Sequence, residues 1–366
     1  MLKRSAQFAA RNQAGLFGKL RLNVKELEIR PLPPPPADVV ACGVVAADAG
    51  QISIELSPFS LEFLFVADDT GTAHVAEFFP LSTLKEDVED LFARSAVLAG
   101  FATALGVKWP DFSSVWNAAL EIDPAFAPDV HLIANTLREI AEWAVCVHLA
   151  EKAPTTGPGL RRVVLHDGML SSFLMRIDIV REHLPAWWRD EAWERRGVAL
   201  AGVGKSSRRW EELAVALELD SRVKSAQDCY VMVGEDVEAV MGRRRQAQQR
   251  QGFGELALMR LKGNSPGYWL PVDLPPWIAG DVATREAVLA VIAQSSRITF
   301  PRPGYPAPLG RAHEAARLTS FDASVVKDLV VRALREEMDE AEFEKLLRGW
   351  AFQPAGWEKV GGLRPE

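Results

Sequence analysis

Cysteine is scarce in this chain of 366 residues, which has only three. Cys42, Cys146 and Cys229 stand far apart, and no C-x-x-C pair occurs. Neither a disulfide framework nor a structural zinc site is therefore expected. Each cysteine lies in apolar sequence, so we expect it to be a small buried hydrophobic residue.

Long apolar runs and an excess of basic residues are also missing. No stretch reaches the roughly 18 apolar residues of a membrane helix, and no apolar signal-peptide core follows the N-terminal residues. We therefore expect a cytoplasmic protein with no membrane segment. The net charge is −7, whereas proteins that coat DNA non-specifically are usually basic. Binding of nucleic acid would need a local basic surface, a divalent metal ion or a partner that delivers the DNA.

The hydrophobic pattern predicts a mixed α/β fold. Residues 39–47 form a continuous apolar run that ends at Asp48, which is typical of a buried strand. Alternating segments at 52–56, 61–66 and 73–79 predict antiparallel strands. Helical periodicity follows, and strands at 163–165 and 197–203 then alternate with helices. Later segments predict a hairpin at 255–272 and helices at 284–294, 309–317 and 322–338. This order predicts a ribonuclease H-like mixed sheet flanked by helices, with an additional hairpin and C-terminal helices.

Three regions of the chain are distinguished by composition. Residues 1–37 read as an N-terminal arm that ends in a proline-rich linker, with prolines at 31 and 33–36. Residues 38–340 form the predicted main domain, and residues 341–366 form a peripheral tail. Arginines at 243–245 and 250 lie in a polar segment, which is either a solvated face or a patch that follows phosphates.

Two aspartates, Asp48 and Asp167, each follow an apolar strand and precede a glycine-containing turn. The carboxyl ends of neighbouring strands form the usual site crevice of an α/β sheet. Two acids there repel each other unless a cation neutralises them, and hard divalent cations prefer oxygen ligands. A helix between the strands offers Glu139 as a third acid, with Glu142 as its rival. The pattern predicts a divalent-metal site of the kind that cleaves phosphodiesters.

Four segments, in order, resemble the motifs of the NurA nuclease family. Residues 44–50 resemble its first motif, a strand that ends in Asp-Gly, although Ala49 replaces that glycine. Residues 164–170 resemble its Asp-Gly-Ser-Leu motif, with Met169 in place of serine. Residues 202–207 resemble its strand followed by Ser-Lys-Ser, with a glycine before Lys205. Residues 303–313 resemble its C-terminal Tyr-Pro…Ala-His signature, with Tyr305 and His313.

The resemblance implies a metal-dependent nuclease that acts on DNA ends, mainly 5′→3′, on single and double strands. It implies a homodimer that works with a HerA-type hexameric ATPase, in DNA end repair or in defence against phage. Carried over by position, Asp48, Glu139, Asp167 and His313 would hold Mn²⁺ or Mg²⁺. Tyr305 would line the same site, and Lys205 would balance phosphate charge.

Two other interpretations remain open at this point. A catalytically degenerate NurA-like subunit that only scaffolds the ATPase is compatible with the motif departures. Residues 48–53 also resemble the first phosphate loop of actin-like phosphotransferases, although residues 166–169 lack the glycines of a second loop. A P-loop is not present, because Ala199 stands where that motif needs a glycine. His313-Glu314 does not continue to a second histidine, so a zinc-protease helix is excluded as well.

Overall fold

The structure is a computed structural model, and the residues that it describes are 24–25, 27–37, 42–56, 59–80, 94–106, 130–154, 159–204, 208–225, 228–234, 252–261, 268–297 and 304–351. Lys205 and the arginine-rich residues 243–245 and 250 lie outside these ranges. No helix among the described residues combines the length and the apolar character that crossing a membrane requires.

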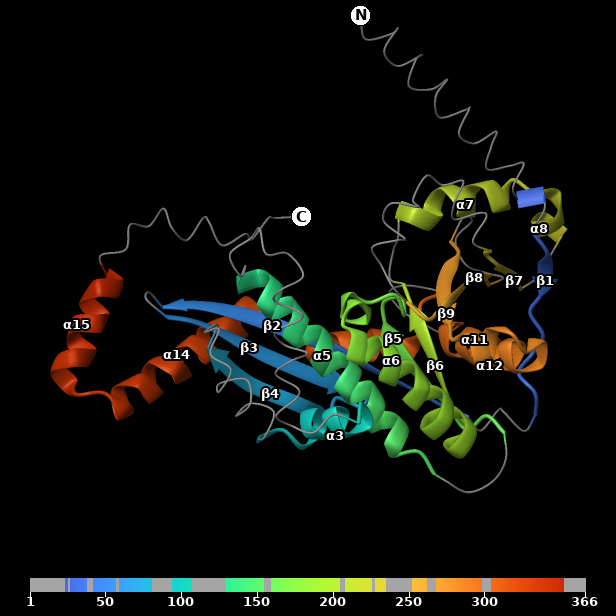
Figure 1. Cartoon of the computed structure of the whole chain (residues 1–366). Helices are drawn as coiled ribbons and strands as arrows, with labels where there is room; N and C mark the ends of the chain where they lie inside the picture. Colours follow the sequence, from blue (N-terminus) through green and yellow to red (C-terminus); the bar gives the residue numbers. More distant parts are fainter. Residues whose placement is uncertain are drawn as a thin grey trace, which may run out of the picture.

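A nine-stranded mixed sheet runs through the described chain, in the order β1-β7-β8-β9-β6-β5-β2-β3-β4 (Figure 1). β2, β3 and β4 pair antiparallel, β5 lies parallel to β2, and β6 lies parallel to β5. The partial order β4-β3-β2-β5-β6 with these directions is the ribonuclease H-like arrangement, so the predicted fold class is confirmed. The strands are β1 (Ile29–Pro31), β2 (Gly43–Leu56), β3 (Phe59–Asp68), β4 (Ala73–Pro80), β5 (Arg162–Asp167), β6 (Val198–Val203), β7 (Cys229–Met232), β8 (Glu255–Arg260) and β9 (Leu270–Leu274).

Helices cover both faces of the ribonuclease H-like part of the sheet. On one face, Ala47 and Val164 pack with α3 (Ala96–Ala104), α5 (Val130–Glu151) and α6 (Asp178–Trp187). On the other face, Ala46 and Leu165 pack with α12 (Val282–Ser296) and α13 (Ala307–Ala316). Successive side chains of a strand point to opposite faces. Burial of both faces therefore explains why β2 and β5 begin as continuous apolar runs rather than alternating ones.

The remaining helices surround this core. α7 (Arg208–Glu218) and α8 (Ser221–Ser225) lie near β7 and β8, and α11 (Pro276–Ala279) precedes α12. A 3₁₀ helix η2 (Phe173–Arg176) precedes α6, and a π-helical segment η3 (Trp188–Glu194) follows it. α14 (Ser320–Glu337) and α15 (Glu340–Ala351) form one end of the molecule in Figure 1. The helices predicted at 284–294, 309–317 and 322–338 are present as α12, α13 and α14, and the β8–β9 hairpin is present as well. Cys146 and Cys229 are buried as expected, whereas Cys42 is only half-buried.

One expectation is corrected. Asp48 does not end a strand, because β2 continues through it to Leu56 while remaining paired with β3. Instead, the pairing of β2 with β5 stops at Ala47, so Asp48 lies where its neighbour ends.

Parts of the proposed arm and tail lie within the described residues. Residues Ile29–Pro31 of the arm pair with β7 as an antiparallel edge strand. Within the predicted tail, Phe343 of α15 is buried. The division of the chain into arm, main domain and tail itself stays a prediction.

Candidate active site

Asp48 and Asp167 lie on adjacent parallel strands. Ala47 of β2 is in register with His166 of β5, and each aspartate is the next residue along its strand. Because side chains alternate along a strand, Asp48 shares a face with Ala46, and Asp167 shares it with Leu165. That face is the one covered by α12 and α13. Asp48 is buried and Asp167 is half-buried, so the two acids sit together at the end of β5.

The segment around the start of α13 supplies two side chains to these acids. His313 Nδ1 lies 2.7 Å from Asp48 Oδ2, and the Tyr305 hydroxyl donates to Asp167 Oδ1 over 3.4 Å. Burial raises the pKa of Tyr305 well above its ordinary value, and Asp167 and Asp48 raise it further. The tyrosine therefore stays a hydrogen-bond donor. The His313 side chain is 47% exposed, so this side of the site is open to a substrate.

Glu142 of α5 interacts electrostatically with both aspartates. It is buried on α5, and burial raises its pKa from the ordinary 4.5 to about 8. Arg138 lowers that pKa, whereas Asp48, Asp167 and Glu139 raise it by charge repulsion. The sequence left Glu142 as the rival of Glu139. Glu139 is only half-buried, and its assignment as a metal ligand stays a prediction.

Arg138 is a site residue that sequence reasoning missed. Its Nη1 lies 2.8 Å from Glu142 Oε1, four residues further along α5. An arginine and a glutamate at this spacing face each other on one side of a helix, and this spacing was the available signal. Arg138 brings one positive charge to a group of carboxylates, so it limits their mutual repulsion when no metal ion is bound.

A buried pair of stacked rings connects β5 with α5. His166 stacks on Trp143 of α5, with ring centroids 4.3 Å apart and an interplanar angle of 23°. Burial lowers the pKa of His166 to about 4, against an opposing interaction with the Gly168 backbone. The ring is therefore neutral near pH 7. His166 precedes Asp167 on β5 and Trp143 follows Glu142 on α5, so this uncharged pair adjoins two of the acids in the chain.

The turn after Asp167 is fixed by a second buried acid, Asp273 of β9. Asp273 Oδ2 accepts a hydrogen bond from the Leu170 N–H over 2.9 Å, and the Gly168 N–H donates to the Val203 carbonyl. Gly168 has φ +118°, a conformation that favours glycine. The glycine of the sequence motif is thus required by the turn, whereas no sequence signal pointed to Asp273.

The carboxylates of the site suit a hard divalent cation by their chemistry, although their oxygens do not surround a single point where one would bind. Among the described residues, no three histidine, cysteine, aspartate or glutamate side chains lie in a geometry ready to hold a metal ion. The chemistry does fit: three carboxylates on β2, β5 and α5 interact electrostatically, with one arginine beside them. Small side-chain movements of Asp48 and Glu142, each now held by a cationic or imidazole partner, would expose their oxygens.

Comparisons with known proteins returned only remote structures. No family model matches the chain, and no curated protein matches it either. The crystal structure of the NurA nuclease from Sulfolobus solfataricus is 12% identical, with a TM-score of 0.42, covering 91% of this chain and 96% of that one. A structure of NurA bound to dAMP and manganese is 13% identical, with a TM-score of 0.39, covering 93% and 98%.

These structures carry the name of the family whose motifs the sequence resembles. Their TM-scores are below 0.5 and their identities are near 12%, so neither the fold nor the chemistry assigned to this chain depends on them.

Proposed function

We propose that this chain is a divalent-metal-dependent DNA nuclease of the NurA type. The observation that carries the proposal is the placement of Asp48 and Asp167 at matching positions of adjacent strands, where they contact His313 and Tyr305. The charges of both aspartates also act on Glu142 of α5. Few chemistries need several carboxylates at one open edge of a sheet. Phosphodiester hydrolysis with bound divalent metal ions is one that does.

The proposed roles follow from the contacts. Asp48, Asp167 and His313, with Glu142 or Glu139 as the helix acid, are the proposed ligands of Mn²⁺ or Mg²⁺. When bound, such ions activate water and stabilise the leaving oxygen of the phosphodiester. Tyr305, kept protonated by its raised pKa, orients Asp167 or donates to a phosphate oxygen. Lys205, next to the described Gly204, is proposed to balance phosphate charge.

The substrate and setting of the proposal come from the motif resemblance. We propose action on DNA ends, as a 5′→3′ exonuclease and a single-strand endonuclease, in DNA end repair or anti-phage defence in the cytoplasm. The net charge of −7 gives weak sequence-independent affinity for DNA, because such affinity comes from neutralising phosphates. A HerA-like hexameric ATPase that delivers the DNA is therefore the proposed partner.

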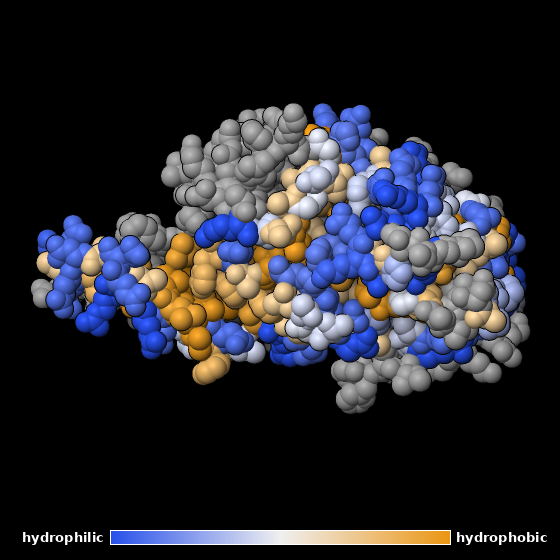
Figure 2. Space-filling view, turned by 90° about the horizontal axis from the view of Figure 1, so that it is seen from below, coloured by the Kyte–Doolittle hydropathy of each residue, from blue (hydrophilic) through white to orange (hydrophobic). Residues whose placement is uncertain are grey.

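A homodimer is also proposed, and α14 offers a surface for it. Phe321, Val325 and Leu329 lie at intervals of four residues and are 72%, 42% and 52% exposed. Residues at this spacing form one stripe along a helix. Figure 2 shows apolar side chains gathering on the underside of the molecule next to its narrow end. An uncovered apolar stripe is typical of a subunit contact.

A second candidate is a degenerate subunit that only scaffolds the ATPase. It is favoured by the absence, among the described residues, of a closed group of metal ligands. The two candidates differ in one measurable property, which is whether the purified chain cuts DNA in a metal-dependent way.

The test is cleavage of labelled single-stranded and duplex DNA with Mn²⁺, with Mg²⁺ and with a chelator. Asp48→Asn and Asp167→Asn should each abolish metal-dependent cleavage while the melting temperature is kept or raised, because each relieves repulsion in the metal-free protein. Asp178→Asn is the matched control, since Asp178 is an exposed residue of α6 paired with Arg181. Wild-type rates in either site variant would refute the site. Failure of the wild type to cut would favour the scaffold, and ATP binding without cutting would favour a phosphotransferase.

A further inference from the structure

Helix α13 meets strand β2 at three successive points. Ala46, Asp48 and Gly50 alternate along β2 and therefore share one face. Asp48 is the middle point, where its carboxylate contacts His313. The two outer points are separate contacts, and neither was expected from the sequence.

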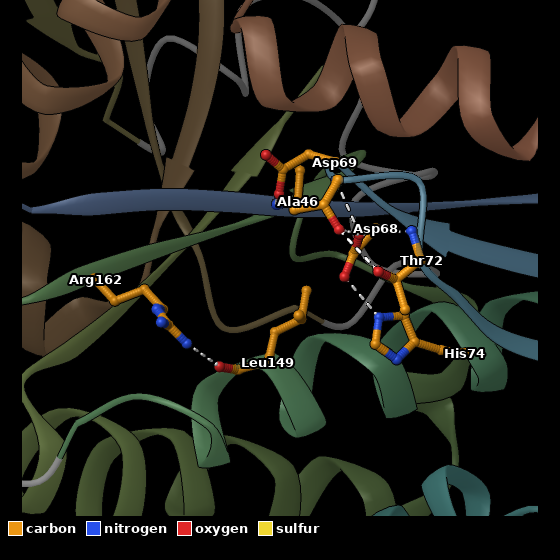
Figure 3. A network of polar contacts seen from close by, with 8 residues as sticks. Ala46, Asp68, Asp69, Thr72, His74, Leu149 and Arg162 are labelled. Carbon is orange, nitrogen blue, oxygen red and sulfur yellow. Dashed lines mark hydrogen bonds and ion pairs between the residues drawn. The ribbon is translucent and has the colours of Figure 1, made fainter.

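The first outer contact is made through Asp69, which follows the end of β3. Asp69 Oδ1 accepts a hydrogen bond from the Ala46 N–H over 3.2 Å, and the Asp69 N–H donates to the Ala46 carbonyl over 3.0 Å. Figure 3 shows Asp69 against Ala46, while the neighbouring Asp68 points to Thr72 and His74. Asp69 is thereby attached to β2 two residues before Asp48.

Arg311 of α13 completes this contact. Its Nη2 lies 2.8 Å from Asp69 Oδ2, and its Nε donates to the Asp69 carbonyl over 3.1 Å. The Asp69 side chain is only 7% exposed, whereas that of Arg311 is 56% exposed. Because a nearly buried carboxylate is costly without polar partners, these two hydrogen bonds from the Arg311 guanidinium stabilise Asp69. Arg311 stands two residues before His313.

The second outer contact depends on the absence of a side chain. A Cβ added to Gly50 would lie 2.1 Å from the carbonyl oxygen of Ala316. The last turn of α13 therefore approaches β2 more closely than any residue other than glycine permits. Arg311 precedes His313 in α13 and Ala316 follows it. The two outer contacts therefore hold the helix on either side of His313.

We propose that Asp69 and Arg311 are positioning residues that hold α13 where His313 reaches Asp48. This inference rests on the proposed function for its catalytic consequence. Neither side chain touches the reacting atoms. Their effect on metal binding and on the rate passes entirely through His313.

The test compares Arg311→Gln and Asp69→Asn with the wild type. Binding of Mn²⁺ to the metal-free protein, measured by calorimetry, should weaken about tenfold in each variant, as for other residues that orient a metal ligand. In a His313→Ala background, Arg311→Gln should cause no further loss. Arg317→Gln is the matched control, because Arg317 directly follows the same helix and its Nη1 lies 3.7 Å from the exposed Glu314 carboxylate. This variant should bind Mn²⁺ like the wild type.

A second measurement separates this inference from the proposed function. Amide hydrogen exchange in α13 of the metal-free protein should be faster in Arg311→Gln and Asp69→Asn than in Arg317→Gln. Unchanged exchange would overturn the inference, whether or not the wild type binds Mn²⁺ or cuts DNA. An additive loss of Mn²⁺ affinity from Arg311→Gln in the His313→Ala background would also overturn it. If the wild type binds no Mn²⁺ but amide exchange in α13 is faster in both variants, the positioning role of Asp69 and Arg311 is supported and the proposed function fails.

Discussion

Burial shifts the pKa values of two side chains near the aspartates, Glu142 and His166, in opposite directions. Burial raises the pKa of Glu142 to about 8 and lowers that of His166 to about 4. Burial penalises the charged form of either group. Between these two values both side chains are neutral, so the metal-free site carries fewer charges than its composition suggests. Binding of a cation would then compete with the proton on Glu142.

This shift makes stability depend on pH. The folded pKa of Glu142 lies above its ordinary value of 4.5, so the folded state binds the proton more tightly than the unfolded state. Its contribution is fully present below pH 4.5 and is lost as the pH rises towards about 8. In Glu142→Gln, the free energy of unfolding of the metal-free protein should therefore fall less between pH 4.5 and about 8 than in the wild type. Urea unfolding at a series of pH values measures this. The exposed Glu182→Gln of α6 should leave the fall unchanged, and an equal slope in Glu142→Gln and the wild type would contradict the assignment.

At the scale of elements, the close approach of α13 to β2 decides which side chains meet in the site. β2 carries Asp48 in its middle, and α13 brings His313 to it. This approach is possible because Gly50 has no side chain, which leaves room for the Ala316 carbonyl. A strand glycine normally weakens a sheet, and it is retained where another backbone comes close.

Gly50→Ala should therefore destabilise the protein and separate His313 from Asp48. We expect a loss of about 1–3 kcal/mol in the free energy of unfolding, as for other overpacked sites, together with weaker Mn²⁺ binding. Gly43→Ala is a control on the same strand, because a Cβ there meets nothing within 4 Å. Equal melting temperatures and Mn²⁺ affinities for the two variants would show that α13 is not held in this way.

The exposed stripe of α14 gives a second prediction at this scale. If Phe321 lies in a dimer contact, Phe321→Glu should convert the dimer to a monomer in sedimentation or mass photometry, because it places a charge among buried apolar side chains. Lys327→Gln changes the net charge by the same amount at an exposed position of the same helix and should leave the dimer intact. A wild-type chain that sediments as a monomer would remove the proposed role of the stripe.

At the scale of the whole molecule, the negative net charge and the open carboxylate edge have to be reconciled with a polyanionic substrate. The charge of −7 disfavours long-range attraction of DNA. Bound cations would neutralise the site locally, but they would not gather DNA from solution. Delivery by a partner that already encloses the DNA raises its local concentration instead.

Duplex cleavage should therefore depend on the proposed ATPase. We expect the initial rate on blunt duplex DNA at physiological salt to rise roughly tenfold or more when the cognate HerA-like ATPase and ATP are added, since linked binding can raise effective affinity by larger factors. The site variant Asp167→Asn with the same ATPase is the control for contaminating nuclease. Full-rate digestion of duplex DNA by the isolated chain would count against a delivering partner.

The sequence by itself determined the order of elements, the mixed sheet and the two aspartates on neighbouring strands. It could do so because apolar runs and their periodicity record local structure and burial, and because Asp167 ends its strand within the same short motif. The motif resemblance added Tyr305 and His313, which the fold brings to those aspartates.

Only the tertiary structure decided which of the two helix glutamates is buried and which distant contacts hold the elements around the aspartates together. Glu139 and Glu142 differ by three residues on one helix, and the packing of α5 on the sheet buries Glu142. Asp69 and Arg311 are 242 residues apart in the chain, and Asp273 contacts a turn 103 residues before it. Periodicity says which face of an element is buried, but not which distant polar group it meets. Those pairings depend on how closely α13 packs on the sheet and on where β9 pairs within it. Both are settled by packing of the whole core.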